Sequence, residues 1–351
     1  MRLRVSDFDY ELPRSAIAQR PVEPRDASRL LVLDRAASGP GHPSLIHAAF
    51  RDLPRWLTTG DLLVVNDSRV IPARLRGRRC GGGAAEILLL RPAGERRWEA
   101  LVRPSRRLAV GSVVELASGD AVSIGETLSP GTRAVTFGSD PMAALAAVGE
   151  TPVPPYIHDR STPAERYQTV YAEPAGSAAA PTAGLHFTTD LLASLAEAGI
   201  GQARLTLHVG LDTFRPMAVR WVDQHQIHGE WYQVPAPAVA ALASTRAAAG
   251  RVVAVGTTSV RVLETVARQG PPSGWTSAFI YPPYAFAAVD RLITNFHLPR
   301  SSLLVLVTAF VQAGMPGTGV LGARDTLLAA YRTALAEGYR FFSFGDAMLI
   351  L

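Results

Sequence analysis

The sequence contains no lysine, so all 35 of its basic residues are arginines. Enzymes that form a Schiff base with their substrate need a lysine amine, and a nucleotide-binding P-loop needs the lysine of its motif. Both classes of mechanism are therefore excluded. A biased genome composition is the favoured explanation for the missing lysine and the abundant alanine. The net charge of +5 permits a polyanionic partner and does not require one.

Cysteine and long apolar runs are scarce as well. Cys80 is the single cysteine, which excludes an internal disulfide, a cysteine zinc site and a cysteine-ligated iron–sulfur cluster. The longest apolar run, residues 303–311, is too short to span a membrane. The N-terminal MRLRVSDFDYELP lacks the apolar core of a secretory signal. We therefore expect a cytoplasmic protein without membrane contact.

What the sequence does contain predicts a globular protein of two domains. A chain of 351 residues with 48% hydrophobic and 19% charged residues can bury a sizeable core. Within residues 69–150, short β-rich segments such as AAEILLL and RWEALV alternate with Gly, Pro and Ser. We expect residues 69–150 to form a small antiparallel β-barrel. It is inserted in a mixed α/β (α+β) domain made of residues 1–68 and 151–351.

The barrel segment is rich in arginine. Residues 69–107 hold 11 arginines against three glutamates, an imbalance typical of a surface that binds a nucleic-acid phosphate backbone. A solvated arginine-rich surface would have the same composition. The arginines that we assign to the candidate contact are Arg69, Arg74, Arg76, Arg103 and Arg106.

Residues 168–215 form an apolar stretch with almost no charge, in which His186 and His208 stand beside hydroxyls and glycines. This composition is typical of backbone wrapped closely around a ligand. Residues 203–209 alternate, which predicts a strand that carries His208 on its polar face near the carboxyl end. Thr188 or Thr189 is a candidate N-cap of the helix before that strand.

A second junction lies in RVVAVGTTSVRVLETVARQG, where a buried strand meets Gly256 and then a helix. The start of such a helix presents free N–H groups and the positive end of its dipole to an anion. Arg261, one turn into the helix, is placed to add a bidentate contact. A strand–glycine–helix turn alone is weak support for a site.

A third junction is LITNFHLP, where a predicted strand delivers Asn295 and His297. Histidine is the usual proton-transfer group at neutral pH, and its occurrence at three junctions of one kind favours an active site. The run from His225 to Glu230 does not have zinc-protease spacing, so we expect no metal. Downstream, a helix is predicted at residues 302–313 and a strand at residues 339–344.

Several blocks then show a resemblance to a known family. PTAGLHFT, LHVGLDTFRP, VGTTSVRVLE, LITNFHLP and YRFFSFGDAMLI resemble the signature blocks of the S-adenosylmethionine:tRNA ribosyltransferase-isomerases of queuosine biosynthesis, and DFDYELP, EPRDASRLLVLDR and NDSRVIPARL extend the match to the N-terminal region. The resemblance implies an α/β domain with an inserted β-barrel. It also implies that S-adenosylmethionine donates its ribosyl part to 7-aminomethyl-7-deazaguanine in a tRNA anticodon. Adenine and methionine leave, and epoxyqueuosine-tRNA is formed.

That chemistry implies roles for the residues at the junctions. His186, His208 and His297 are the candidates for the base that deprotonates the carbon next to sulfonium and for the acid that protonates adenine. Asp212 or Asp346 would bind the ammonium or the ribose hydroxyls. The remaining substrate-binding candidates are Thr182, Gly184, Thr188, Thr213, Arg215, Gly256, Thr257, Thr258, Ser259, Arg261 and Asn295. The expected partners are S-adenosylmethionine as co-substrate, with no further cofactor, and the tRNA, bound by a monomer.

The chain departs from the family pattern at Asp212, where the family usually has glycine. Tyr281-Pro-Pro-Tyr284 replaces a usual Pro-Gly-Tyr, and Ile227 replaces a methionine. A carboxylate in the expected site could alter the choice of acceptor. Two alternatives therefore remain, a paralogue that uses the same donor on another acceptor and a non-catalytic RNA-binding module.

Overall fold

The computed structural model describes residues 2–129, 131–159, 161–210 and 216–351. The described chain divides into two compact units. The larger comprises residues 1–68, 155–174 and 181–351, and the smaller comprises residues 69–154 and 175–180. The segment 175–180 clusters with the smaller unit, whereas the sequence analysis placed it in the larger domain.

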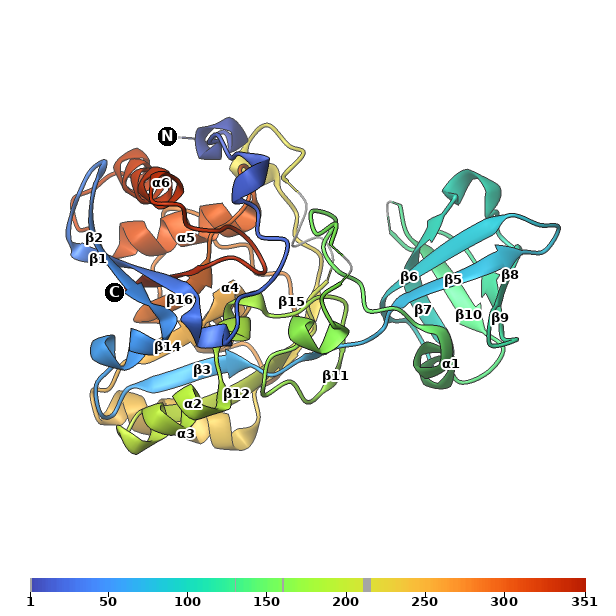
Figure 1. Ribbon diagram of the computed structural model, residues 1–351, viewed down its shortest axis with the longest axis horizontal. Helices are drawn as coiled ribbons and strands as arrows, with labels where there is room; N and C mark the ends of the chain where they lie inside the picture. The colour runs from blue at the N-terminus through green and yellow to red at the C-terminus, as the bar shows by residue number, and fades with distance from the viewer. Residues whose placement is uncertain (1, 130, 160, 211–215) are drawn as a thin grey trace. The chain divides into compact units, whose positions relative to one another are not determined.

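The larger unit is built on a nine-stranded mixed sheet with the order β15-β13-β12-β3-β14-β16-β17-β1-β2 (Figure 1). Strands β12, β3, β14 and β16 are parallel neighbours, and β17 runs antiparallel to β16. The strand bounds are β1 Arg29–Gly39, β2 His42–Ala49, β3 Leu62–Asn66, β12 Gly201–Leu207, β13 Glu230–Gln233, β14 Val252–Val255, β15 Ser273–Thr276, β16 Arg291–Asn295 and β17 Ala347–Ile350.

Helices and short 3-10 turns accompany this sheet. The helices are α2 Thr189–Glu197, α3 Ala236–Ala247, α4 Gly256–Ala267, α5 Ser302–Ala313 and α6 Val320–Ala336. The 3-10 turns of the larger unit are η1 Val5–Phe8, η2 Arg14–Ala16, η3 Arg25–Ala27, η4 Phe50–Trp56, η6 Ala164–Tyr167, η7 Thr182–His186 and η9 Val222–Gln224. Of the two predicted cap residues, Thr188 caps α2 by accepting the N–H of Leu191 at 3.1 Å.

The smaller unit is a closed six-stranded barrel in which every neighbouring pair of strands is antiparallel. The inward-facing residues of these strands, such as Leu75, Ile87 and Val114, form a separate apolar core. Its elements are β5 Arg74–Arg79, β6 Ala84–Pro92, β7 Arg97–Arg103, η5 Ser105–Arg107, β8 Val113–Leu116, β9 Ala121–Ile124, β10 Arg133–Phe137 and α1 Pro141–Val148; a two-stranded parallel pair, β4 Arg69–Val70 with β11 Ala175–Ser177, completes the unit. The predicted mixed fold class with a small antiparallel barrel is confirmed.

The expected strand at residues 339–344 is wrong. The chain turns there, with Phe342 at a φ of 69°, and the last strand is β17 at Ala347–Ile350. Asp346 explains the turn, because its carboxylate accepts the backbone N–H of Arg340 at 2.8 Å and that of Arg29 at 3.0 Å. The aromatic side chains of this segment are buried in a cluster instead of alternating across a sheet.

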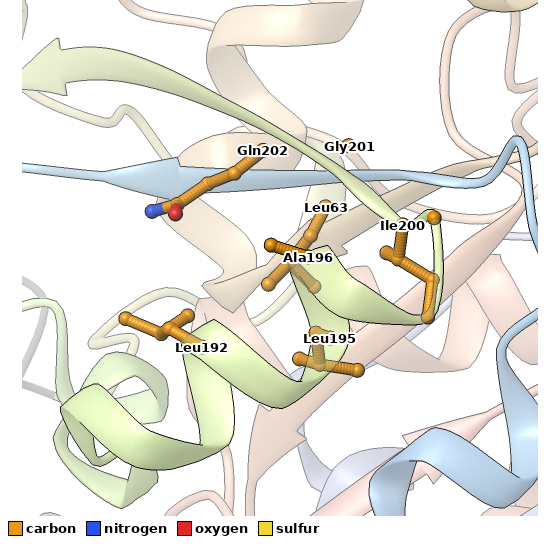
Figure 2. A pocket seen from close by; sticks show the side chains of 8 residues that line it. Leu63, Leu192, Leu195, Ala196, Ile200, Gly201 and Gln202 are labelled. Atoms are coloured by element: carbon orange, nitrogen blue, oxygen red, sulfur yellow. The ribbon is translucent and has the colours of Figure 1, made fainter.

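On one side, apolar side chains line the amino ends of the parallel strands. A pocket of about 360 Å³ lies between α2 and the starts of β3 and β12 (Figure 2). Aliphatic side chains such as Leu63, Leu192 and Leu195 line it, and Gln202 is its polar side chain. Because no titratable group lines this pocket, it offers no means of proton transfer.

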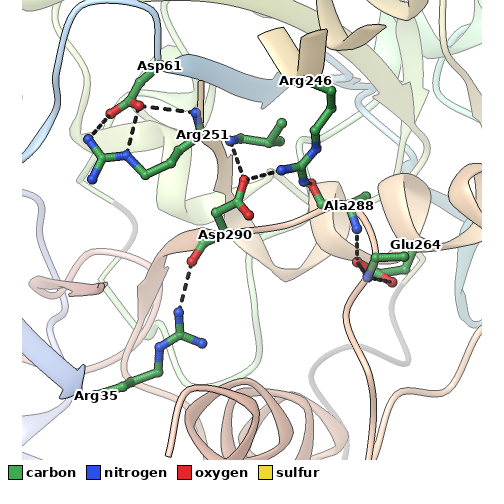
Figure 3. Close-up of polar contacts among 9 residues, drawn as sticks. Arg35, Asp61, Arg246, Arg251, Glu264, Ala288 and Asp290 are labelled. Carbon is green, nitrogen blue, oxygen red and sulfur yellow. Dashed lines mark hydrogen bonds and ion pairs between the residues drawn. The ribbon is translucent and has the colours of Figure 1, made fainter. Parts of the chain in front are cut away.

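Ion pairs also connect residues at the same amino ends (Figure 3). Arg251, directly before β14, donates to both oxygens of Asp61, directly before β3, at 2.9 and 3.0 Å. Asp290, directly before β16, accepts from Arg246 at 2.8 Å and from the N–H of Val252 at 2.7 Å. These pairs hold the strands in register, so the amino ends serve structure.

Candidate active site

The opposite edge of the sheet gathers the polar junctions of the sequence. It contains the carboxyl ends of β12, β3, β14 and β16 and the amino ends of β17 and β1. His208 follows β12, Asp67 follows β3, Gly256 follows β14, and Asn295 with His297 stands at the end of β16. Crevices at the carboxyl ends of strands are where α/β sheets bind ligands.

His186 lies in the turn η7 and belongs to a buried hydrogen-bonded chain. Its Nε2 lies 3.1 Å from the amide nitrogen of Asn295, and its Nδ1 lies 2.7 Å from Ser28 Oγ. The Asn295 amide oxygen accepts from the hydroxyl of Thr182 at 2.8 Å. Asn295 thus connects both ends of η7 to the end of β16.

These hydrogen bonds determine which ring nitrogen of His186 carries the proton. An amide nitrogen can only donate, so Nε2 must accept and the proton resides on Nδ1, which donates to Ser28. Burial, with smaller effects of neighbouring arginines, lowers the pKa of His186 to about 3. The ring also stacks on Phe50, with 5.1 Å between centroids. Both ring nitrogens of the neutral His186 side chain are therefore engaged in hydrogen bonds within the protein.

Gly184 in the same turn is packed too closely for any other residue. A Cβ at this position would lie 2.2 Å from the hydroxyl oxygen of Tyr171 and 2.8 Å from Cγ2 of Thr169. Gly184 therefore allows η7 to approach the segment before it. The hydroxyl of Thr188, a further candidate, caps α2 and donates to Asp26 at 3.1 Å.

His297 is held at the end of β16 between two hydroxyl groups. Its Nδ1 lies 3.4 Å from the hydroxyl of Tyr331, and its Nε2 lies 3.4 Å from that of Thr294. Its N–H donates to the Tyr331 hydroxyl at 3.2 Å, and its carbonyl accepts from Tyr10. Burial lowers the pKa of His297 to about 3. This imidazole is neutral and enclosed.

His208 differs from the other two histidines. It is partly exposed, and within the described ranges its Nδ1 has no hydrogen-bond partner. Its ring stacks on Trp231 with 5.2 Å between centroids, and its N–H donates to the Trp231 carbonyl at 3.0 Å. Burial lowers the pKa of His208. Burial therefore favours the neutral imidazole, and its buried Nδ1 has no partner within the described ranges.

The start of α4 forms the middle of the edge. Gly256 has a φ of 84°, which lets the chain turn directly from β14 into the helix, and no side chain of the described residues caps the helix start. The hydroxyl of Thr258 lies 3.4 Å from the amide nitrogen of Asn66. The hydroxyl of Ser259 donates to the Val255 carbonyl at 2.7 Å. The candidates Gly256 and Thr257 thus present backbone to this edge.

Arg261 does not point toward an open space. Its guanidinium pairs with Glu230 and donates to the carbonyl of Ala278 at 3.0 Å, and it lies 3.5 Å from that of Thr276. The other oxygen of Glu230 accepts the N–H of Gly210 at 2.7 Å. Arg261 is thereby connected through one carboxylate to the chain just after His208.

The two carboxylates that the sequence analysis proposed for ligands have different outcomes. Asp346 is buried, and its oxygens accept the N–H groups of Arg29 and Arg340, so it stabilises the turn before β17. Asp212, together with Thr213 and Arg215, lies outside the described residues.

Sequence reasoning missed three residues of this edge: Ser28, Asp67 and Glu230. Asp67 had a recognisable signal, because Asn66-Asp67-Ser68 offers turn chemistry directly after a buried strand. Ser28 and Glu230 had none, since their partners are 158 and 31 residues away.

Across the described ranges, no group of three or more His, Cys, Asp and Glu side chains is placed to hold a metal ion. None of the helices in those ranges is long and apolar enough to cross a membrane.

The barrel unit holds most of the net charge. Its twelve arginines and eight carboxylates give a formal charge of +4, of the +5 of the whole chain. Arg76 pairs with Glu150 at 3.2 Å, and Arg74 lies 4.0 Å from Glu86. Arg69 begins β4. Five arginines of this unit are exposed and have no ion pair within the described residues: Arg78 on β5, Arg96 before β7, and Arg103, Arg106 and Arg107 at or after the end of β7.

Comparisons with known proteins agree with this architecture. The family described as "Queuosine biosynthesis protein" matches residues 5–350. Curated relatives named S-adenosylmethionine:tRNA ribosyltransferase-isomerase occur in Symbiobacterium thermophilum (51% identical) and Moorella thermoacetica (52% identical). Each alignment covers 99% of this chain and 100% of the relative.

A solved structure is similar as well. It is the crystal structure of S-adenosylmethionine tRNA ribosyltransferase from Thermotoga maritima, with a TM-score of 0.55 and 40% identity. The match covers 99% of this chain and 100% of that chain. The resemblance seen in the motifs is confirmed: the chain belongs to the queuosine biosynthesis protein family, whose curated relatives are transferase-isomerase enzymes.

Proposed function

We propose that this chain transfers and isomerises the ribosyl group of S-adenosylmethionine onto 7-aminomethyl-7-deazaguanine in tRNA. The products would be epoxyqueuosine-tRNA, adenine and methionine. The observation that carries the proposal is the collection of His208, the uncapped start of α4 and the η7 turn at one edge of the sheet. The names of the curated relatives support the donor and the tRNA.

We assign the proton-abstracting role to His208. The base must be neutral before the reaction and must have a nitrogen that can reach the substrate. Both nitrogens of His186 are used by Ser28 and Asn295, and those of His297 lie against hydroxyls of the protein. His208 Nδ1 is buried and has no hydrogen-bond partner among the described residues, so no protein group competes for its lone pair. The proton on the carbon next to sulfonium would pass to this nitrogen.

The other residues of η7 and β16 are then positioning residues. Hydrogen bonds link four side chains in series: Thr182, Asn295, His186 and Ser28. This network holds η7 against the sheet. A fully satisfied buried network of this kind fixes one geometry. We propose that it keeps the wall of the donor pocket rigid during turnover.

The start of α4 is the proposed site for the carboxylate of the methionine part. Free N–H groups and the helix dipole favour a negative charge at Gly256 and Thr257. Arg261 would support this site indirectly, since its guanidinium is already engaged by Glu230 and by carbonyl oxygens. We therefore propose Arg261 as a positioning residue and not as a direct ligand.

The barrel is the proposed contact for the tRNA backbone. Its charge of +4 makes it the favoured surface for phosphates. Arg103 and Arg106, with Arg107, are exposed and carry no ion pair in the described residues, whereas Arg74 and Arg76 are close to carboxylates. We expect the first group to contribute more to tRNA affinity. We propose a cytoplasmic monomer with no cofactor beyond S-adenosylmethionine.

The decisive experiment incubates the protein with S-adenosylmethionine and tRNA that carries 7-aminomethyl-7-deazaguanine. Equal amounts of adenine and methionine, released only with that tRNA, support the proposal. Release with a different acceptor identifies a paralogue, and tRNA binding without release identifies an RNA-binding module. His208→Gln is the variant that should abolish release, and His42→Gln, at an exposed position on β2, is its matched control.

A further inference from the structure

The larger unit contains five buried carboxylates among its described residues: Asp61, Asp67, Glu230, Glu264 and Asp346. Taking a carboxylate out of water is costly unless a counter-charge or several hydrogen bonds replace the water. The partners of each carboxylate therefore show whether it stabilises the fold.

In four of the five carboxylates, an ion pair or several hydrogen bonds replace the lost contacts with water. Asp61 pairs with Arg251, and Glu230 pairs with Arg261. Glu264 accepts the N–H groups of residues 287 and 288 at about 3 Å, and the hydroxyl of residue 284 lies 3.4 Å away. Asp346 accepts two backbone N–H groups and lies 3.6 Å from the Arg340 guanidinium. Each of these carboxylates holds two parts of the chain together.

Asp67 is the exception. Its side chain accepts one hydrogen bond, from Thr206 Oγ1 at 2.7 Å, and forms no ion pair within the described ranges. Arg204, a guanidinium whose charge acts on Asp67, pairs instead with the exposed Glu173 at 3.2 Å. Asp67 is nonetheless only 6% exposed. Burial raises the pKa of the Asp67 carboxyl, against the lowering effects of Thr206 and Arg204.

The position of Asp67 is also unusual for a carboxylate with one partner. Its N–H donates to the Leu205 carbonyl at 2.9 Å, and its carbonyl accepts the N–H of Glu173 at 2.8 Å. The residue is therefore held rigidly at the carboxyl end of β3. Thr206 lies on β12 and His208 directly follows the strand, two positions further on; the alternation of an extended chain places both on the same side, about 6.6 Å apart along it. Asp67 thus shares a face with the proposed base.

We propose that Asp67 binds a primary ammonium group of a substrate. One carboxylate oxygen accepts from Thr206, and no other side chain is seen to bond the second oxygen among the described residues, which suits a compact point charge better than a bidentate guanidinium. The missing counter-charge would be supplied by the ligand. The inference rests on the proposed function, in which two substrates carry such a group: the aminomethyl group of the acceptor base and the amino group of the methionine part.

Asp67→Asn tests the proposal, because asparagine keeps the shape and can still accept from Thr206 but carries no charge. The matched control is Asp346→Asn, which removes the charge of an equally buried but well compensated carboxylate. Thermal unfolding without substrates, the Kd of S-adenosylmethionine by calorimetry, and kcat/KM for the acceptor tRNA are measured for each protein.

We expect Asp67→Asn to keep or raise Tm, since it removes an uncompensated buried charge, whereas Asp346→Asn lowers it. One substrate constant should worsen about 10- to 100-fold in Asp67→Asn, as loss of a charged hydrogen bond predicts. A weaker Kd for S-adenosylmethionine identifies the methionine amino group. An unchanged Kd with a lower kcat/KM for tRNA identifies the aminomethyl group.

The proposal is overturned if both constants stay within about twofold of wild type, or if Asp67→Asn lowers Tm as much as Asp346→Asn does. Failure of the proposed function has a different signature. Wild-type protein would then release no adenine with the acceptor tRNA, while the calorimetric comparison of wild type and Asp67→Asn could still be made.

Discussion

Breaking the ion pair between Arg261 and Glu230 is the most informative perturbation of the scaffold behind the site. The two side chains are 7% and 8% exposed, so neither charge can be solvated by water when its partner is lost. Arg261→Met leaves Glu230 with the N–H of Gly210 as its remaining described partner. Removing one partner of a buried pair costs about 3–5 kcal/mol. For a unit of this size that corresponds to a fall in Tm of about 6–20 °C.

Glu230→Gln should be milder, because the amide oxygen can still accept from Gly210 and Arg261 keeps its bond to the Ala278 carbonyl. The double variant Glu230→Gln/Arg261→Met should recover most of the loss, since no buried charge remains unpaired. Calorimetric unfolding of the three variants and wild type gives the coupling energy. Additive losses in the double variant would refute the reasoning.

The same variants separate two roles for Arg261. As a positioning residue it acts through Glu230, so both single variants should lower turnover while the Kd of S-adenosylmethionine stays near that of wild type. As a direct ligand of the carboxylate, Arg261→Met alone would weaken that Kd by about 10-fold or more. Calorimetric titration with S-adenosylmethionine measures the difference.

Three further predictions follow from the histidines and the barrel. His208→Ala should lower adenine release about 10²- to 10⁴-fold with Tm nearly unchanged, measured by single-turnover chromatography and thermal unfolding; normal turnover would contradict its role. Because the pKa of His186 is lowered to about 3 in the folded protein, the unfolded chain binds an extra proton below about pH 6.5, and stability falls as pH falls. His186→Gln should reduce this slope by about 1.4 kcal/mol per pH unit between pH 6 and 4, measured by denaturant unfolding, and an unchanged slope would contradict the buried neutral state. Arg103→Glu and Arg106→Glu should each weaken tRNA binding and reduce its log–log salt slope by about 0.7–0.9, whereas Arg76→Glu should have less effect.

Elements with strong local signals could be predicted from the sequence. The helix at Ser302–Ala313 has an apolar run and a serine N-cap, and the structure has it at the predicted residues. The barrel strands were recognisable because apolar alternation and turn residues repeat within a short segment. The prediction of a strand at residues 339–344 failed. The aromatic residues there have high β propensity, but Asp346 and the positive φ of Phe342 impose a turn.

The three histidine junctions could be found from the sequence, but their roles could not be separated there. The role of His186 depends on Ser28 and Asn295, which lie 158 and 109 residues away in the sequence. The engagement of Arg261 depends on Glu230, which lies on another strand. The turn that contains Asp67 is recognisable in the sequence, but its lack of a paired counter-charge becomes visible only when the partners of all buried carboxylates are compared. Long-range pairing of polar groups is the information that a local pattern lacks.

Release of adenine from S-adenosylmethionine tests the central claim most directly. Wild-type protein is incubated with the donor and with tRNA carrying 7-aminomethyl-7-deazaguanine, and the products are separated by chromatography. We predict adenine and methionine in equal amounts with a gain in the mass of the modified nucleoside, all lost in His208→Gln. Formation of S-adenosylhomocysteine, or equal adenine release by His208→Gln, would contradict the account.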